Sequence, residues 1–255
     1  EHFERPNQVL LTGATGFVGS MMLRDLLLYR KKLGIEGGVA VLCRAKKKMS
    51  AKERIAALLD HDMFEFLSSQ EKTSLVHVVE GDVAKPNMGM STTERNRVYQ
   101  LPLSHVIHCA ASVKFNQSLE GAAVTNITSS LQLQQLAKKL KAKFVYMSTA
   151  FVHGGNIGSR NEPLPENLFS LGKYDAEDIY QSMLGSQSLA SSALNDLRFP
   201  NTYTISKCVC EHLLLRDKES DTIIVRPCIV GPACSSPWEG WAGDSPSTLV
   251  AGACL

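Results

Sequence analysis

A tyrosine and a lysine four residues apart are the first candidates for chemistry. Tyr203 and Lys207 lie in a predicted helix over residues 202–215, so both side chains leave one face of the helix, a turn apart. By itself this pair is common by chance, and two exposed neighbours are its simplest interpretation. Its weight comes from other features: Ser148 and Thr149 follow a predicted strand, and a glycine-rich loop follows the first strand. Phenol and ammonium groups are among those that general acid–base catalysis uses.

Three glycines near the N-terminus separate a short apolar strand from an amphipathic helix in the pattern G-x-x-G-x-x-G. Gly13 allows a tight turn, Gly16 lets backbone N–H groups approach phosphates, and Gly19 lets the helix lie close to the strand. A plain strand-to-helix turn is the alternative, but the flanking elements favour a pyrophosphate site. The residues that we assign to cofactor binding here are Thr12, Gly13, Thr15, Gly16, Phe17, Val18 and Gly19.

A basic residue follows the second predicted strand, residues 39–43. An acid at this place would bind the 2′-hydroxyl of NAD, whereas Arg44 suits the 2′-phosphate of NADP, so we expect NADPH as the cofactor. Three lysines come next. For Lys46 and Lys47 a solvated start of a helix is the preferred interpretation, and the role of Lys48 is left open.

Two further strand ends carry residues that can contact the cofactor. After the third strand, Asp82 can meet the adenine with the N–H of Val83 beside it, or it can cap the following turn, and the sequence favours neither. After the fourth strand, Ala110 and Ala111 are small enough to let a cofactor lie against the backbone. The carboxyl ends of parallel strands are where open α/β sheets bind ligands.

The order of the predicted elements gives the fold class. We expect strands at residues 9–11, 39–43, 75–79, 106–109 and 144–147 and before Pro227, and helices up to about residue 32, at 51–67, at 125–140 and at 202–215. This alternation predicts an α/β protein with a doubly wound parallel sheet, a Rossmann fold with right-handed crossovers. Asn126 is interpreted as a structural hydrogen-bonding residue, and His108 as a histidine of the core.

The length, composition and net charge are those of an ordinary globular chain. Its 255 residues, 44% of them hydrophobic and 20% charged, suffice for one large α/β domain over residues 1–255. The net charge of +2 gives no reason to expect nucleic acid as a partner. No apolar run approaches the ~18 residues of a membrane span, so we expect no membrane segment in this chain.

The cysteines bear on the cellular compartment of the protein, and the first residue bears on whether the chain is a fragment. Seven scattered cysteines without a C-x-x-C pair indicate an intracellular, reducing compartment, and neither a disulfide framework nor a metal site. The sequence begins at Glu1 without a methionine, so we expect a fragment of a longer protein. Attachment to an organelle membrane through the remainder is left open.

Six stretches of the sequence follow a known pattern in the right order. They are TGATGFVG (12–19), VIHCAASVKFN (106–116), STAFVHG (148–154), FPNTYTISK (199–207), IIVRPCIVGP (223–232) and PWEGWAGD (237–244). Together they resemble the extended short-chain dehydrogenase/reductase superfamily over nearly the whole chain, and within it the fatty acyl-CoA reductases and their thioester-reductase relatives. The resemblance implies an extended-type Rossmann fold, an insertion over residues 154–200 and the start of a small C-terminal substrate lobe over residues 231–255.

The resemblance also implies roles for individual side chains. Tyr203 would be the general acid for the carbonyl oxygen that receives hydride. Lys207 would stabilise the phenolate, lower the pKa of Tyr203 and hold the nicotinamide ribose. Thr149 would donate a second hydrogen bond to the substrate oxygen, with Ser148 as the fallback.

Further positions of the family pattern lie around this centre. Pro227 and Ile229 would wall the nicotinamide. Lys114, where relatives often carry arginine, would face the substrate, and His153, where the superfamily often has tyrosine, is expected at the rim. The insertion would either shape the access of a bulky acyl group or be a mobile surface excursion, and the serine-rich tract 186–192 favours the second.

The predicted function is the NADPH-dependent reduction of a long-chain acyl-CoA, or of another acyl thioester, to the aldehyde. The resemblance favours a second reduction to the primary alcohol, although the side chains leave the product open. One alternative is a sugar-nucleotide epimerase or dehydratase, against which Arg44 and Trp241 argue. The other is a catalytically silent NADP-binding scaffold, against which the intact Thr149, Tyr203 and Lys207 argue.

Overall fold

The computed structural model of the protein describes residues 7–155 and 163–243. The contacts within the chain divide it into two units, each described by itself below. Within the described residues, the first unit comprises 7–82, 89–110 and 227–243. The second unit comprises 83–88, 111–155 and 163–226.

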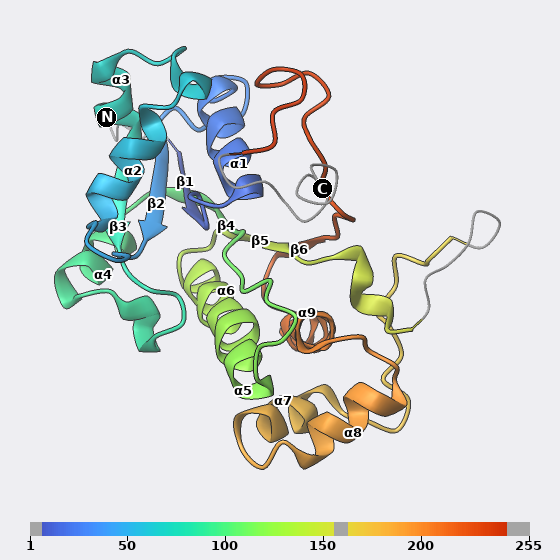
Figure 1. The fold of residues 1–255 in the computed structure, drawn as a ribbon. Coiled ribbons are helices and arrows are strands. Elements are labelled where there is room, and N and C mark those ends of the chain that lie inside the picture. The colour runs from blue at the N-terminus through green and yellow to red at the C-terminus, as the bar shows by residue number, and fades with distance from the viewer. Residues whose placement is uncertain (1–6, 156–162, 244–255) are drawn as a thin grey trace. The chain divides into compact units, whose positions relative to one another are not determined.

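The predicted doubly wound parallel α/β sheet is confirmed (Figure 1). Its six strands follow the order β3-β2-β1-β4-β5-β6. The strands are β1 (Gln8–Thr12), β2 (Val39–Cys43), β3 (Val76–Glu80), β4 (Leu103–His108), β5 (Lys143–Met147) and β6 (Thr222–Val225). The α-helices are α1 (Phe17–Leu28), α2 (Ala51–Leu59), α3 (Ser69–Leu75), α4 (Thr92–Tyr99), α5 (Leu119–Ala122), α6 (Ser129–Lys139), α7 (Ala176–Leu184), α8 (Ser188–Asp196) and α9 (Thr202–Arg216). Shorter helical turns are η1 (Asp62–Phe64), η2 (Pro86–Gly89), η3 (Ala123–Thr128) and η4 (Ala150–His153).

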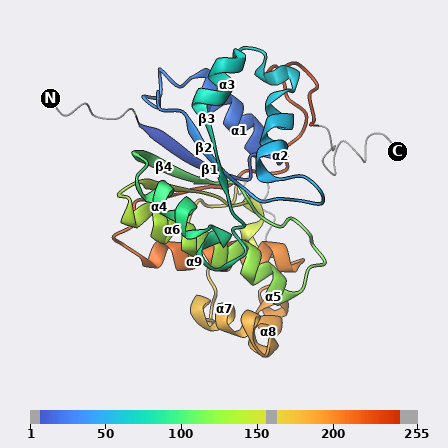
Figure 2. The ribbon, with the colours of Figure 1, turned by 90° about the vertical axis from the view of Figure 1, so that its left-hand side faces the viewer.

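In the first unit, β1 lies between β2 and β4 and is parallel to both (Figure 2). Leu10 pairs with Ala40 on one side and with Val106 on the other. All five residues of β2 are buried, as is usual for parallel strands covered on both faces. Because the chain leaves β1 towards β2 and returns on the other side as β4, the carboxyl ends of β1 and β4 form the switch point at which such sheets bind ligands.

The second helical region of the first unit is shorter than predicted. Ser50 and Glu53 form a capping box that starts α2 where the sequence predicts a helix. The single helix predicted over residues 51–67 is nevertheless wrong, because α2 ends at Leu59 and the turn η1 follows it. His61, which has an extended backbone, caps the start of η1 and separates the two.

In the second unit, β5 pairs with β6, and α6 packs against β5 and α9. The helix predicted over residues 125–140 begins instead as a π-helical turn, η3, and continues as α6. Two serine hydroxyls donate to backbone carbonyls one turn earlier, Ser129 to Thr125 and Ser130 to Asn126, both at 2.7 Å. π-helical turns are frequent at functional sites, and Asn126 lies inside this one.

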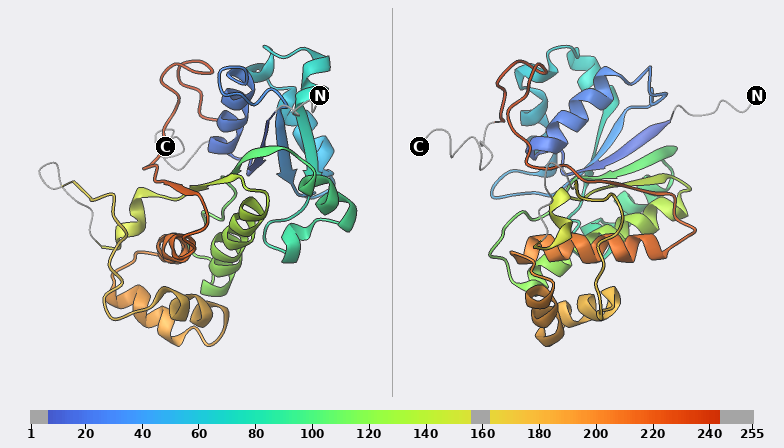
Figure 3. Two further views of the ribbon diagram at one scale, coloured as in Figure 1. Left: turned by 180° about the vertical axis from the view of Figure 1, so that it is seen from behind. Right: turned by 90° about the vertical axis from the view of Figure 1, so that its right-hand side faces the viewer.

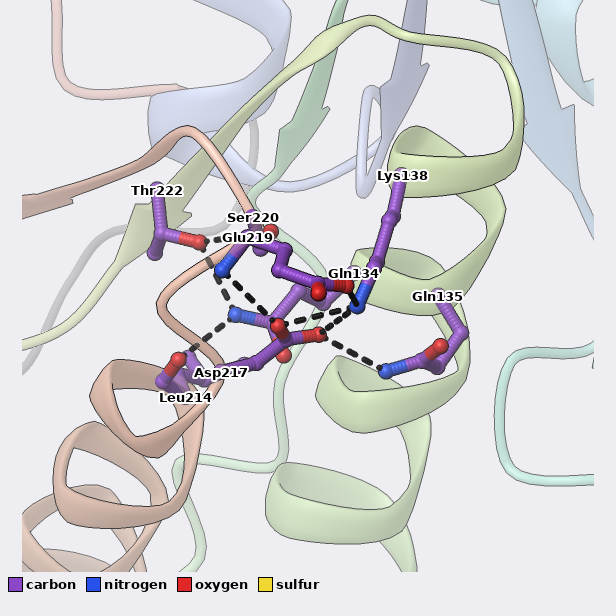
Figure 4. A network of polar contacts seen from close by, with 8 residues as sticks. All are labelled: Gln134, Gln135, Lys138, Leu214, Asp217, Glu219, Ser220 and Thr222. Atoms are coloured by element: carbon purple, nitrogen blue, oxygen red, sulfur yellow. Dashed lines mark hydrogen bonds and ion pairs between the residues drawn. The ribbon is translucent and has the colours of Figure 1, made fainter.

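A polar network joins the C-terminal end of α9 to α6 and to the start of β6 (Figure 4). The buried amide of Gln134 donates to the Leu214 carbonyl at 2.7 Å and to Thr222 Oγ1 at 2.8 Å. The Lys138 ammonium lies 3.0 Å from both carboxylate oxygens of Asp217. We call this network the terminal clasp of α9, because it fixes that end of the helix to β6.

The predicted insertion over residues 154–200 is described from residue 163 onward, and there it is a packed part of the second unit. Helices α7 and α8 lie against each other, and α7 also contacts α9 (Figure 1). Ala190 and Ala193 of α8 are fully buried. A mobile excursion, which the sequence favours for the tract 186–192, therefore does not fit the part of it that forms α8.

Residues 227–243 belong to the first unit and lie beside α1 (Figure 3). Trp241, only 7% exposed, stacks on Phe17 with the ring centroids 5.1 Å apart. Trp238 contacts Trp241 edge-on and stacks on His61 at 5.9 Å. We call these four rings the aromatic stack. Of the predicted substrate lobe, residues 244–255 lie outside the described residues.

Within the described residues there is no membrane-spanning helix, no cluster of metal ligands and no disulfide. No helix within residues 7–155 and 163–243 is long and apolar enough to cross a membrane. Within the same ranges, no three His, Cys, Asp or Glu side chains gather as metal ligands. The six described cysteines form no disulfide with one another, and Cys254 lies outside the described residues.

Candidate active site

The three glycines of the loop after β1 are required for different reasons. Gly13 has a φ of +79°, and a Cβ atom there would lie 2.5 Å from the backbone nitrogen of Ala110. A Cβ atom at Gly19 would lie 2.0 Å from the Gly13 carbonyl oxygen, so the fold itself requires both glycines. Gly16 is exposed, and a Cβ atom there would have one close neighbour, the Gly13 oxygen at 3.3 Å. Its missing side chain therefore leaves room for a ligand outside the loop.

The N-terminus of α1 fits an anion. Gly16 is the N-cap, no side chain caps this helix, and its first turn contains no acidic residue. The first backbone N–H groups and the helix dipole therefore favour a negative group at this end. Thr15 is exposed, and Phe17 and Val18 are half-buried beside it. The loop thus fits the pyrophosphate of a dinucleotide.

Thr12 joins the ends of β1 and β4 from within. Its hydroxyl lies 2.7 Å from His108 Nδ1 and accepts a hydrogen bond from the N–H of Ala110 at 3.3 Å. His108 is 1% exposed, in agreement with its interpretation as a core histidine. The side chain of Thr12 is fully buried, so it supports the loop from behind. Val83 and Ala111, which are also predicted to contact the cofactor, lie in the second unit.

Arg44 and Asp82, both predicted to contact the cofactor, are close together after β2 and β3. Arg44 Nη1 lies 3.3 Å from Asp82 Oδ2, and the Arg44 side chain is 58% exposed. A third residue, which no motif indicates, joins this end of the sheet to the glycine loop. Arg54 on α2 donates to Thr15 Oγ1 at 2.8 Å and to the Arg44 carbonyl at 2.6 Å.

Arg54 also lines a basic hollow of about 590 Å³. The other lining residues are Lys46, Lys47, Lys48 and Met49. Lysine and arginine side chains around an open hollow can hold a phosphate group, arginine through paired hydrogen bonds and lysine as a point charge. The lysines that the sequence suggests as a solvated helix start therefore share a surface with a guanidinium that contacts the glycine loop.

Tyr203 and Thr149 meet in the second unit. Thr149 is 4% exposed, and its hydroxyl oxygen accepts a hydrogen bond from the N–H of Phe151 at 3.3 Å, which leaves its proton available. Burial raises the pKa of Tyr203 above its usual value, and the side-chain hydrogen bond with Thr149 acts in the opposite direction. The phenol is therefore protonated at neutral pH and can donate.

Lys207 lies one helical turn beyond Tyr203 on α9 and is 3% exposed. Its ammonium group donates to the Met147 carbonyl at 2.7 Å, at the carboxyl end of β5. It also lies 4.5 Å from the centroid of the Tyr146 ring, within the range of a cation–π interaction. Two fixed partners thus hold a buried positive charge on the helix face that carries the phenol.

The hydrogen-bond partners of Ser148 and Asn126 differ from those of Thr149. Ser148 Oγ is buried and has no hydrogen-bond partner among the residues that the structure describes. Asn126 accepts from the N–H of Ser112 at 2.8 Å and donates to Ser206 Oγ at 3.0 Å. Both ends of its amide are engaged, which agrees with a structural role. Asn126 thereby ties the segment after β4 to α9.

The remaining predicted residues are scattered around these centres. Lys114 is exposed beside Phe115, whose ring centroid lies 6.1 Å from that of the candidate acid. In the first unit, Pro227 is half-buried and Ile229 is 57% exposed. His153, expected at the rim, is instead 5% exposed. Burial lowers its pKa, so it is a neutral core ring.

The predicted site residues are divided between the two units. The glycine loop, Arg44 and Asp82 come together in the first unit, and Thr149, Tyr203 and Lys207 in the second. Residues that no motif indicates are Arg54, Glu211 and His61, and Arg226 lies inside a quoted motif without a role assigned to it. Of these, Glu211 has a sequence signal, since it continues the four-residue spacing of Tyr203 and Lys207.

The strand order, the glycine loop at the β1–β4 switch point and the Tyr–Lys pair on α9 define the class: a Rossmann domain of the extended short-chain dehydrogenase/reductase type. The fold is that of the terminal reductase domain from the myxalamid biosynthetic pathway, with a TM-score of 0.67 at 21% identity. That likeness covers 95% of this chain and 53% of the other.

The family model described as "Male sterility protein" matches residues 11–253, and the chain belongs to this family. Fatty acyl-CoA reductase 1 of Xenopus laevis is 30% identical over 250 residues. Fatty acyl-CoA reductase 1 of Gallus gallus is 29% identical over 253 residues. Each alignment covers 94% of this chain and 46% of the relative, so the chain spans a little less than half the length of these relatives.

Proposed function

We propose that the protein is an NADPH-dependent reductase of a fatty acyl-CoA, or of another acyl thioester, that forms the aldehyde and then the primary alcohol. The observation that carries the proposal is that the Thr149 hydroxyl lies beside the Tyr203 phenol, with the buried Lys207 ammonium one turn along α9. Relatives named as fatty acyl-CoA reductases support the substrate class. The side-chain set supports the reaction class, because it supplies two donors for one carbonyl oxygen.

A bound reduced nicotinamide would supply one hydride per reduction, so two NADPH molecules are used in turn, and the first reduction releases the thiol of the thioester. Tyr203 donates its proton to the substrate carbonyl oxygen as negative charge develops there. Thr149, whose oxygen is held by the N–H of Phe151, donates a second hydrogen bond to the same oxygen. Lys207 stabilises the phenolate that remains until a proton returns. The same donors serve the thioester and the aldehyde, since each presents one carbonyl oxygen.

The preference for NADPH over NADH rests on the basic end of the first unit. Arg44 is exposed where the ribose of a dinucleotide meets a Rossmann sheet, and Arg54 with the three lysines lines the hollow nearby. Asp82, close to Arg44, is placed to orient the guanidinium. A 2′-phosphate would find several cations here.

The test follows NADPH oxidation by the intact protein with a long-chain acyl-CoA and, separately, with a UDP-sugar. We expect oxidation with the thioester alone, and aldehyde and alcohol among the extracted products. Tyr203→Phe is expected to lower kcat by about 10²–10⁴-fold. It should leave the Kd for NADPH unchanged, because the phenol hydroxyl is not needed for cofactor binding.

Two outcomes would contradict the proposal. Turnover of the UDP-sugar without turnover of the thioester would make the protein an epimerase or dehydratase. Tight NADPH binding without turnover of any carbonyl compound, in wild type and Tyr203→Phe alike, would make it a silent nucleotide-binding protein.

A further inference from the structure

The second unit contains a buried ion pair that the mechanism above does not use. Arg226 donates from Nε to Glu211 Oε1 at 2.9 Å and from Nη2 to Glu211 Oε2 at 2.6 Å. The Glu211 side chain is 1% exposed and that of Arg226 15%. Arg226 Nη1 also donates to the Asn167 carbonyl at 3.1 Å. The ion pair therefore has two hydrogen bonds between its partners, is shielded from water, and is held by a third hydrogen bond to the backbone.

The pair lies in line with the candidate catalytic residues. Tyr203, Lys207 and Glu211 follow one another at intervals of four along α9, so they share one face of the helix. Arg226 follows directly on β6. The β6 end is itself joined to the β5 end, where the N–H of Ser148 donates to the Val225 carbonyl at 2.7 Å. The ion pair therefore links α9 to the strand ends that deliver Ser148.

Stability alone is a poor reason for such a pair. Taking two charges out of water costs about as much as their attraction returns, and apolar residues of similar size often serve a fold equally well. In addition, the terminal clasp already fastens α9 to the start of β6. A charge pair on the catalytic face therefore requires an explanation in terms of what it does to its neighbours.

The Glu211 carboxylate is the nearest acid to Lys207 along the helix face. If it were unpaired and buried, it would attract the ammonium one turn away and draw it from the Met147 carbonyl. Arg226 satisfies both carboxylate oxygens, so the attraction is neutralised. The ammonium is then held by Met147 and by the Tyr146 ring, on the side of the phenol.

We propose that Arg226 and Glu211 are positioning residues that set the charge and the place of the Lys207 ammonium. This inference rests on the proposed function, in which Tyr203 is the acid. Each partner has its own effect: the carboxylate favours a protonated phenol, and the guanidinium favours the phenolate. When the two residues are paired, their opposite effects on the protonation of the phenol cancel.

Other groups that interact electrostatically with this region come from several elements around α9. They are Cys208, Cys210 and His212 on α9, Tyr146 on β5, His153 on η4, Ser130 on α6, and Glu166, which acts on Arg226. Burial raises the pKa of both thiols, that of Cys210 to about 11, and burial lowers that of His153. The two thiols, the Tyr146 phenol and His153 are therefore neutral at neutral pH, so a change in the ion pair changes the local charge strongly.

The experiment measures the alkaline limb of the pH profile of kcat for thioester reduction by the intact protein. Reduction needs the protonated phenol, so the rate falls as the pH rises through the pKa of Tyr203. Arg226→Met leaves a bare carboxylate and is expected to move the limb to higher pH, on the order of one unit. Glu211→Gln leaves a bare guanidinium and is expected to move it to lower pH by a similar amount. The double variant is expected to return the limb to its wild-type position.

Two variants provide the controls. Arg226→Lys keeps the positive charge and should leave the limb in place even if it weakens the fold. Lys138→Met removes an ion pair of the terminal clasp and should lower the melting temperature without moving the limb. A lowered melting temperature with no movement of the limb in Arg226→Met and Glu211→Gln, or movement in the same direction in both, would overturn the inference.

The failure of the inference and that of the proposed function give different results. If Tyr203→Phe reduces the thioester as fast as wild type, the assignment of the acid is wrong and the inference falls with it. If Tyr203→Phe is inactive while the two single variants keep the wild-type limb, the proposed function stands and only the positioning role is lost.

Discussion

Gly16 and Gly19 are identical in type and three residues apart, yet the structure imposes different demands on them. The backbone of Gly13 blocks any side chain at Gly19, while the space outside Gly16 is open apart from one neighbouring oxygen. One position is therefore reserved for packing of α1 on β1, and the other for a ligand. Spacing alone cannot separate these two uses, since both belong to the same motif.

This difference predicts opposite phenotypes for two alanine variants. Gly19→Ala forces a Cβ atom against the Gly13 oxygen and is expected to destabilise the fold by roughly 1–3 kcal/mol. Gly16→Ala is expected to change stability by less than about 1 kcal/mol, because its φ of −94° is ordinary for alanine. It should weaken NADPH binding on the order of tenfold, since a methyl group would face the phosphates. Urea unfolding and a fluorescence titration with NADPH measure the two effects, and reversed phenotypes would contradict the assignment.

Thr149 has a separate signature in the pH dependence. Its hydrogen bond lowers the pKa of Tyr203, so Thr149→Val is expected to raise that pKa and to move the alkaline fall of kcat to higher pH. Loss of the second donor should also lower kcat by about 10²–10³-fold. Thr149→Ser, which keeps the hydroxyl, is the control and should retain most of both properties. A limb that moves to lower pH in Thr149→Val would show that the hydroxyl acts otherwise.

The side chains that the sequence indicates are those whose partners are close in the chain. Tyr203 and Lys207 stand out because helical spacing places them together, and the glycines because they lie between a strand and a helix. Arg54 does not stand out, since the Thr15 hydroxyl that it meets is 39 positions away. Likewise, no local pattern shows that a charge such as Glu211 is buried, because its partner lies on another element.

Helices and strands are predictable in place, and their interruptions are not. The apolar runs of β1 and β2 indicate buried parallel strands, and capping residues mark the start of α2. The π turn before α6 is missed, because it keeps an apolar helical pattern while serine hydroxyls take up its carbonyls. The packing of α8 is missed for the opposite reason, as its serines suggest solvent and its two alanines carry little apolar signal.

The packing of α8 on α7 can be tested with neighbouring substitutions. Ala193 is fully buried, so Ala193→Glu is expected to destabilise the protein on the order of 3 kcal/mol. Ser192→Glu, at the adjacent exposed position, should change stability by no more than about 0.5 kcal/mol. Thermal unfolding of both variants measures the difference. Equal effects would mean that α8 does not rest on α7 through this face.

The order of strands is the part of the architecture that a sequence can predict, because parallel strands joined by helices admit few connections. The division into two units is not, since each unit gathers segments that are far apart in the chain. The first unit closes only when residues 227–243 come back to α1, after the whole second unit has been traversed. The candidate cofactor loop therefore depends on a segment that follows the second unit in the sequence.

Both tryptophans of the chain belong to the aromatic stack on α1. Intrinsic emission at long wavelength therefore reports on the surroundings of one unit, and the other unit contributes none. During denaturation this emission can be compared with helical circular dichroism, to which both units contribute. Coincident curves would mean that the two halves lose structure together, and separate curves would give each half its own midpoint.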